Sequence, residues 1–250
     1  MPQIHIRFYA ELNDFLAAPR RGKGFFYSLR GRVSVKDVIE SLGVPHTEVD
    51  LILVNGFSVD FSAIVQPGDR ISVYPVFEAF DISPLERLRP QPLRLPRFVL
   101  DVHLGRLATI LRLLGFDVIY KNDRTDDELV RLSAGKQRIL LTQDRGLLKR
   151  RLVTRGYCVR ASDPKEQASE VVRRFDLFHV AVPFSRCLRC NGLLEPVDKL
   201  KIMDQLPQYV REHFDSFTRC AGCVRIYWPG SHRNSMERFV DSVLNRTVHQ

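Results

Sequence analysis

Residues 97–120 read RFVLDVHLGRLATILRLLGFDVIY, and this stretch decides the fold of the middle of the chain. An apolar run at 97–101 ends in the carboxylate of Asp101, which predicts a strand with a charged end. The leucines that follow recur at helical spacing and predict an amphipathic helix over 103–114. A second apolar run at 116–120 predicts another strand. A strand, a helix and a strand in this order are typical of a parallel sheet.

The alternation of helices and strands continues beyond this stretch. Thr125 and Glu128 form the capping-box pattern that begins a helix. The further elements expected are a helix over 129–134, a strand at 138–142, a helix over 147–155 and a strand at 157–160. Residues 97–184 are therefore expected to form an α/β domain around a parallel sheet.

The first 80 residues predict an α+β unit instead. Its strands are expected at 4–8, 24–29, 51–54 and 71–77, and its helix over 34–42. IRFYAEL at 6–12, VNG at 54–56 and GDRISVYPVF at 68–77 resemble the ThiS/MoaD ubiquitin-like branch of β-grasp domains. Sulfur-carrying members of that branch end in Gly-Gly, whereas this strand continues into residues 78–81 without one. The resemblance therefore implies a binding or docking module for a protein partner, without sulfur-carrier chemistry.

The composition is that of an ordinary globular chain with two or three domains. Of the 250 residues, 44% are hydrophobic and 27% are charged, which excludes wholesale disorder. No apolar stretch reaches the ~20 residues of a membrane span, and the N-terminus lacks the apolar core of a secretory signal. We therefore expect a cytoplasmic protein without a membrane partner. Four prolines mark residues 81–96 as an extended linker after the first domain, residues 1–80.

The net charge of +9 belongs mainly to the middle of the chain, where residues 97–186 carry 18 basic and 11 acidic side chains. A basic domain suggests a polyanion partner, and an arginine-rich solvated surface is the alternative. If the partner is RNA, its phosphates are expected to contact Arg106, Arg112, Arg145, Lys149, Arg150 and Arg151.

Carboxylates follow two of the predicted strands. Asp101 and Asp144 stand at the carboxyl ends of strands, the edge at which open parallel sheets bind ligands. Asp126 or Asp127 opens a helix that would enter from the same edge. Three carboxylates meeting there would repel one another unless a hard cation such as Mg²⁺ or Mn²⁺ lay between them. Two such ions can activate water for the cleavage of a phosphodiester bond.

Each of these carboxylates also has a purely structural explanation. Asp126 and Asp127 would favour the N-terminal end of a helix dipole. Asp144 could shape a turn, and Asp101 could cap the helix that follows it.

Three segments of the middle part together resemble the PIN-like RNase domain named for the C-terminal region of the Mut-seven exoribonuclease. They are FVLDVHLGRLATILRLLGFDVIY at 98–120, TDDEL at 125–129 and RILLTQDRGLLKRR at 138–151. The PIN fold uses three or four acidic residues on metal ions to cleave RNA. The resemblance implies this catalytic role for Asp101, for Asp126 or its close alternative Asp127, for Asp144 and, as a fourth candidate, for Asp163. Asp163 precedes a proline, and Asp-Pro is also an ordinary turn signal.

Four of the five cysteines form two CxxC pairs. In a reducing compartment this pattern is typical of four thiolates on one tetrahedral zinc ion, which leaves no open position for catalysis. A redox motif needs only one CxxC and would leave the second pair unexplained. Cys187, Cys190, Cys220 and Cys223 are therefore expected to hold one structural Zn²⁺. The remaining cysteine, Cys158, is expected to be a small buried side chain.

Residues 185–250 are accordingly expected to form a zinc ribbon and a C-terminal tail. The elements expected there are a helix around 208–214, a strand at 224–228 and a helix over 236–244. The RNase family that the chain resembles joins its RNase domain to such a ribbon. YW-x-GSH at 227–232 belongs to the same resemblance, and His232 in it is a hypothetical RNA contact.

Two functions are compatible with these patterns. The first is a metal-dependent ribonuclease, whose basic surface and zinc ribbon hold the RNA. The second is a non-catalytic RNA-binding or docking protein on a PIN-like scaffold. The presence of carboxylates at all the expected positions favours the ribonuclease.

Overall fold

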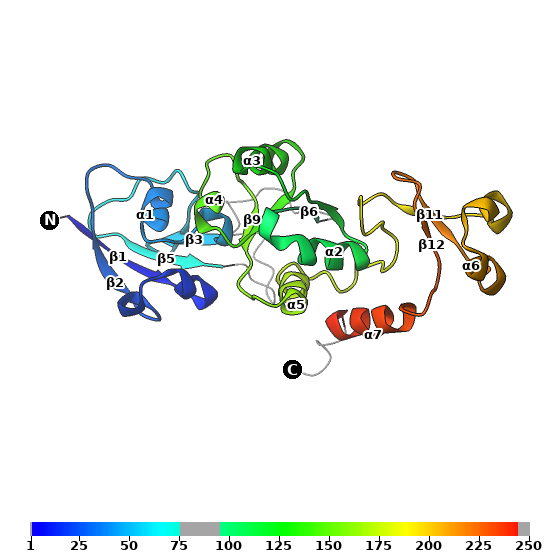
Figure 1. Ribbon diagram of the computed structural model, residues 1–250. Coiled ribbons are helices and arrows are strands. Elements are labelled where there is room, and N and C mark those ends of the chain that lie inside the picture. Colours follow the sequence, from blue (N-terminus) through cyan, green and yellow to red (C-terminus); the bar gives the residue numbers. More distant parts are fainter. Residues whose placement is uncertain (1, 76–95, 245–250) are drawn as a thin grey trace. The chain divides into compact units, whose positions relative to one another are not determined.

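The computed structural model describes residues 2–75 and 96–244 (Figure 1). Contacts group the chain into two compact units. The first unit combines the N-terminal residues with Asp126–Cys158, and the second combines the residues up to Thr125 with those from Val159 onward. The predicted linker at 81–96 lies outside the described residues, apart from Pro96.

The N-terminal sheet has five strands in the order β2-β1-β5-β3-β4. They are β1 (Gln3–Phe8), β2 (Phe25–Ser28), β3 (Leu51–Val54), β4 (Phe57–Ser58) and β5 (Arg70–Tyr74). β1 pairs with β2 in antiparallel and with β5 in parallel, the mixed arrangement of a β-grasp domain. Ile4, Ile6 and Phe8 of β1 are buried, as their alternation along the strand predicts.

The helix α1 (Val35–Ser41) lies over one face of this sheet (Figure 1). Ser34 begins the helix, because its hydroxyl accepts a hydrogen bond from the Asp37 N–H at 3.2 Å. The Asp37 carboxylate accepts in return from the Ser34 N–H at 3.3 Å, which completes a capping box. Gly43, with a φ of +102°, turns the chain after the helix. The predicted start and end of this helix are confirmed.

Four parallel strands follow, of which β6 (Arg97–Leu100) and β7 (Asp117–Ile119) belong to the second unit and β8 (Ile139–Thr142) and β9 (Gly156–Cys158) to the first. β6 pairs with β7 in parallel, and β8 pairs with β9 in parallel. Most side chains of these strands are buried, because helices cover both faces of a parallel sheet. The four predicted strands are confirmed to within two residues at each end.

Two helices of this region begin and end near the predicted positions. α2 (Gly105–Leu113) follows a short 3-10 helix at Val102–Leu104. Leu107 and Leu111 are fully buried on its inner face, which confirms the amphipathic pattern. α3 (Asp126–Gly135) begins directly after Thr125, where the capping-box pattern places its start.

The predicted helix over 147–155 is wrong. Only a single turn forms, α4 (Arg145–Leu148), and Lys149 ends it. The Val153 N–H then donates to the Arg150 carbonyl oxygen at 2.9 Å. This turn buries Val153 completely and brings the chain into β9. The chain therefore turns at Arg150–Val153, where the second half of the helix was expected.

A helix that the sequence analysis does not predict, α5 (Pro164–Arg174), follows β9. The Asp163 carboxylate caps it by accepting from the N–H groups of Lys165 and Glu166 at 2.9 and 3.1 Å. Pro164 occupies the first helical position, where a backbone N–H is not needed. The Asp-Pro pair, interpreted as a turn signal, is thus a helix start.

The C-terminal part has an antiparallel sheet of β10 (Leu194–Pro196), β11 (Thr218–Cys220) and β12 (Ile226–Tyr227). The predicted helices around 208–214 and 236–244 are α6 (Gln208–His213) and α7 (Arg233–Leu244). The core of this part is small, and its buried members are Ile202, Leu206, Val210 and Phe217. Such a core is too small to stabilise this part of the chain without a structural metal ion or a disulfide bond.

The N-terminal domain contacts the segment Asp126–Cys158 of its own unit. His46 links the two, with one ring nitrogen 2.6 Å from Glu40 Oε1 and the other 2.8 Å from the Val153 carbonyl oxygen. The fully buried Glu48 accepts a hydrogen bond from the Cys158 N–H. Cys158 is buried, as predicted.

Two basic side chains reinforce this contact. The Lys149 ammonium donates to the Glu40 carbonyl oxygen at 2.9 Å. The Arg145 guanidinium lies over the Phe15 ring, 4.8 Å from its centroid. In addition, no helix within the described residues is long and apolar enough to cross a membrane.

Candidate functional site

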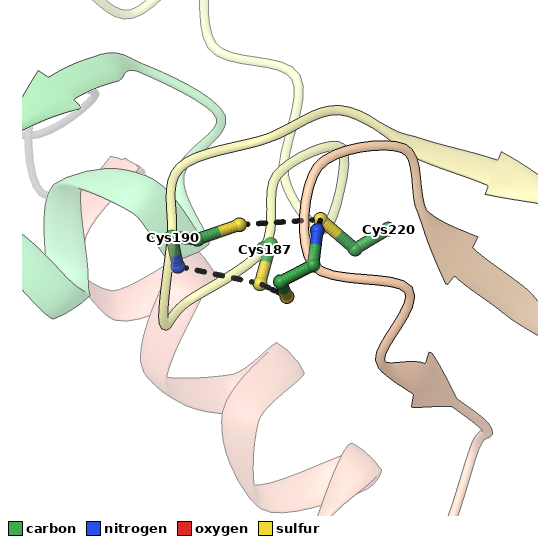
Figure 2. Close-up of side chains that lie close together, drawn as sticks. Cys187, Cys190 and Cys220 are labelled. Atoms are coloured by element: carbon green, nitrogen blue, oxygen red, sulfur yellow. Dashed lines mark hydrogen bonds between the residues drawn. The ribbon is translucent and has the colours of Figure 1, made fainter.

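The four cysteines of the CxxC pairs come together beside the C-terminal sheet. Their sulfur atoms all lie within 4.8 Å of one another. Cys190 Sγ faces Cys220 Sγ (Figure 2), and the two sulfur atoms are 3.3 Å apart. Cys187 Sγ lies 3.6 Å from Cys223 Sγ. Zinc–sulfur bonds of ~2.3 Å place tetrahedral sulfur ligands about 3.8 Å apart. The four cysteines could therefore hold one metal ion such as zinc.

Local hydrogen bonds shape the second cysteine turn. The N–H groups of Gly222 and Cys223 donate to Cys220 Sγ at 3.3 and 3.4 Å. These two bonds fix the direction in which Cys220 Sγ points. Gly192 of the first turn packs against the same sulfur, because a Cβ at that position would lie 2.8 Å from Cys220 Sγ.

Tyr227 adds a hydrogen bond to the cluster from β12. Its hydroxyl oxygen lies 3.0 Å from Cys187 Sγ. Burial raises the pKa of the Cys187 thiol, but hydrogen bonds from Tyr227 and from backbone N–H groups outweigh burial and lower this pKa to about 6. Burial raises the pKa of Cys190 to about 12, so a bound metal must displace its proton. Burial and the bond to Cys187 also raise the pKa of Tyr227 above its usual value.

Arg112 ties the first cysteine turn to α2. Although Arg112 is one of the expected phosphate contacts, the residue is only 5% exposed. Its guanidinium donates to the Val118 carbonyl oxygen at 2.9 and 3.2 Å and to those of Leu188 and Arg189 at 3.0 Å each. Burial lowers the pKa of Arg112 below its usual value. A guanidinium committed to these bonds cannot bind phosphate, so we exclude Arg112 from the expected RNA contacts.

Arg112→Met is expected to lower the Tm of the zinc-loaded protein by about 5–10 °C, because the carbonyl oxygens of Val118, Leu188 and Arg189 lose their donor. Thermal unfolding followed by circular dichroism measures the change. Arg106→Met is the matched control, since Arg106 is exposed on the same helix. A similar Tm for the two variants would show that the buried hydrogen bonds of Arg112 contribute nothing to stability.

Asn191 joins the same cysteine turn to β7, and the sequence analysis does not identify it. Its side-chain oxygen accepts from the Val118 N–H, and its amide nitrogen donates to Asp117, both at 2.8 Å. Its φ of +71° lies in the left-handed region, which asparagine tolerates better than most residues. An asparagine directly after a CxxC pair is the signal that could have revealed this role.

Two of the predicted catalytic carboxylates lie in the second unit. Asp101 follows β6 directly and is 7% exposed. Within the described residues 101–104, its side chain makes no capping hydrogen bond to the helix, so capping does not explain this residue. Asp163, in contrast, has the capping role at α5 described above.

The other predicted carboxylates lie in the first unit. Asp126 and Asp127 are the first two residues of α3, and Asp127 Oδ1 lies 3.1 Å from Arg150 Nη1. Asp144 follows β8 and caps α4, where its Oδ1 accepts from the Gly146 N–H at 2.7 Å. Within each unit, the described residues gather no further set of metal-ligating side chains besides the cysteines. Convergence of the carboxylates of the two units stays a prediction.

Comparisons with known proteins agree with this architecture. A family model described as the Mut7-C RNAse domain matches residues 96–240, and one described as Mut7-C ubiquitin matches residues 1–81. The chain belongs to the Mut7-C RNase family. No curated protein and no solved structure matches it. The Mut7-C RNase match spans the parallel strands and the cysteine cluster, so both belong to one family region.

The remaining basic side chains of the Mut7-C RNase region differ in their surroundings. Arg145 and Lys149 contact the N-terminal domain, and Arg150 forms an ion pair with a carboxylate of α3. Arg106, Arg145, Arg150 and Arg151 are all exposed, but Arg145 and Arg150 already have these protein partners. Arg106 and Arg151 are therefore the expected phosphate contacts that we retain.

Proposed function

We propose that this Mut7-C protein is a metal-dependent ribonuclease that hydrolyses RNA phosphodiester bonds. The observation that carries the proposal is Asp101, a buried carboxylate placed directly after a parallel strand within the family's RNase region. The edge beyond such a strand is where parallel sheets place their ligand sites. Burial restricts the rotamers of a side chain, as a metal ligand requires.

The other proposed ligands come from separate segments of the chain. Asp144 follows β8, another parallel strand, and Asp126 opens α3. Asp126 is preferred to Asp127 because Asp127 pairs with Arg150. Asp163 stays a fourth candidate, through the oxygen that does not cap α5.

These carboxylates would hold one or two Mg²⁺ or Mn²⁺ ions, which supply an activated water and neutralise charge on the phosphate. The contribution of the protein is to hold these carboxylates in position. The Gly146 N–H orients the Asp144 carboxylate, and burial orients that of Asp101. Arg106 and Arg151 would attract the RNA backbone through their exposed charge.

The remaining parts would have supporting roles. We propose that β10–β12 and the four cysteines form a zinc ribbon with one structural Zn²⁺. All five cysteines are free of disulfide bonds, which supports a cytoplasmic location. The ubiquitin-like domain would bind a protein partner, for which the exposed side chains of Phe26 and Phe57 offer apolar surface.

The second candidate is a non-catalytic RNA-binding protein on the same scaffold. The capping roles of Asp144 and Asp163 favour it, because capping alone could account for these two residues. Capping does not account for Asp101. The ribonuclease is therefore the preferred function.

The test is to incubate zinc-loaded protein with end-labelled single-stranded RNA, with and without added Mn²⁺ or Mg²⁺. The ion is omitted rather than chelated, because a chelator would also remove zinc from the cysteines. Products are expected only in the presence of the added ion. RNA binding without cleavage under all conditions would favour the second candidate instead.

A further inference from the structure

The C-terminal part contains two adjoining cavities, of about 480 and 430 Å³, that share Trp228 as a wall. Arg233 and Met236 of α7 also border both. We propose that these cavities receive two neighbouring unpaired bases of single-stranded RNA, with Trp228 as the stacking surface. The inference rests on the proposed function, because it names the form of RNA that the protein holds.

The larger cavity offers rings for stacking and polar atoms for the edge of a base. Phe184, Tyr227 and Trp228 line it together with the polar side chains of Ser216 and Asn234. Because the Tyr227 hydroxyl is hydrogen-bonded to a cysteine sulfur, this residue offers its ring rather than its hydroxyl. A planar base between such rings gains stacking energy regardless of its identity.

Phe184 is held in a strained backbone conformation at the cavity wall. Its φ of +63° lies in the left-handed region, which is unusual for a bulky side chain. A hydrogen bond from its N–H to the Leu113 carbonyl oxygen, at 2.9 Å, helps to fix it there. Strain of this kind is concentrated at binding sites.

The smaller cavity continues the aromatic lining. Tyr209, Phe214 and His232 line it with Trp228, and Tyr209 is 64% exposed. The His213 ring stacks on Tyr209 with the ring centroids 4.1 Å apart. A second base would therefore also find rings on which to stack. Because His232 lines this cavity, it would lie beside the bound RNA.

The charge around the cavities suits a polyanion. The Arg233 guanidinium lies 3.5 Å from the centroid of the Phe184 ring, and its Nε is 2.6 Å from Glu237 Oε1. Arg186 lines the larger cavity, so its border carries two cations and one anion. Four further arginines are exposed on the same part of the chain, namely Arg189, Arg219, Arg225 and Arg238, among exposed carboxylates such as Asp215 and Asp241. Phosphates on either side of the bound bases would contact arginines of this set.

Trp228 also supplies the measurement, because it is the only tryptophan of the chain. The zinc-loaded Asp101→Asn variant is used, because this substitution should prevent cleavage of the RNA. It is titrated with a single-stranded RNA hexamer in buffer without added Mn²⁺ or Mg²⁺. Saturable quenching of tryptophan fluorescence is expected. A hexamer of abasic sugar-phosphate is the control and should bind at least tenfold more weakly, with little quenching. Equal quenching by both hexamers would overturn the proposal.

Variants test the same point with a labelled hexamer and fluorescence anisotropy. Trp228→Leu is expected to weaken binding about 10- to 100-fold, whereas Trp228→Phe retains most of the affinity. Tyr27→Leu, at a partly exposed aromatic residue of the N-terminal domain, should leave the affinity unchanged. Zinc content of one ion per chain confirms that each variant is folded around its metal.

The outcomes separate this inference from the ribonuclease proposal. If Trp228→Leu binds the RNA hexamer as tightly as the wild type does, and the wild type cleaves RNA, only the proposal of base-binding cavities is overturned. Quenching by RNA in a wild-type protein that cleaves nothing overturns only the ribonuclease. Quenching by an uncharged peptide but not by RNA would assign the cavities to a protein partner and overturn the proposal.

Discussion

Asp101→Asn is expected to lower Mn²⁺-dependent RNA cleavage by about a hundredfold or more. Loss of one metal ligand removes several kcal/mol of transition-state stabilisation, and each ~1.4 kcal/mol is a factor of ten in rate. Asparagine has nearly the same shape as aspartate, so the surroundings of this buried side chain are retained. Initial rates on labelled RNA, measured with the zinc content held at one ion per chain, give the comparison.

The same variant should separate metal binding from folding. Without added Mn²⁺, its Tm is expected to equal or exceed that of the wild type, because repulsion between neighbouring carboxylates is relieved. The wild type should gain stability on adding Mn²⁺, since a ligand that binds only the folded state stabilises it by mass action. Asp101→Asn should lose most of that gain. Melting curves with and without Mn²⁺ measure both effects.

Two further variants extend the test to the other unit. Asp126→Asn and Asp144→Asn are also expected to lose the Mn²⁺-induced rise in Tm. Asparagine at 144 keeps the helix cap, so only the charge is removed there. Asp123→Asn is the control, because Asp123 is an exposed carboxylate paired with Lys121 at 2.8 Å. Equal Mn²⁺-induced shifts in all of these proteins would refute the metal site.

Loss of zinc is expected to unfold the C-terminal part. Cys220→Ser removes one of the four thiolates, and the small core of this part cannot replace the metal. Proteolytic cleavage should then appear first between residues 187 and 228, while the parallel strands stay protected. Elemental analysis should give about one zinc per wild-type chain and less than half of that in the variant.

Cys158→Ala is the matched control for the zinc experiment. Cys158 is buried but lies outside the cysteine cluster, so the variant should keep its zinc and its resistance to protease. Wild-type protein with less than about half an equivalent of zinc, but with the C-terminal part protected, would contradict a structural zinc site.

Features that depend on residues close together along the chain are predictable from the amino-acid sequence. The alternation in β1, the capping box of Ser34 and Asp37 and the leucines of α2 were all predictable. Hydrophobic periodicity and caps act within one or two turns, so a short window of sequence contains them. The CxxC pairs belong to the same class, because N–H···S bonds within each turn present both sulfur atoms.

The direction in which a polar side chain faces depends instead on contacts between distant segments. Arg106 and Arg112 lie on one helix, yet only Arg112 is buried, because its acceptors include carbonyl groups 76 and 77 residues away. The helix expected over 147–155 stops early for a related reason, since Val153 packs inside and hydrogen-bonds through its carbonyl to His46. The cavities around Trp228 likewise depend on tertiary structure, because residues of β11, β12 and α7 line the larger one together. Contacts between such distant segments leave no periodic pattern in the sequence, so only the folded chain reveals them.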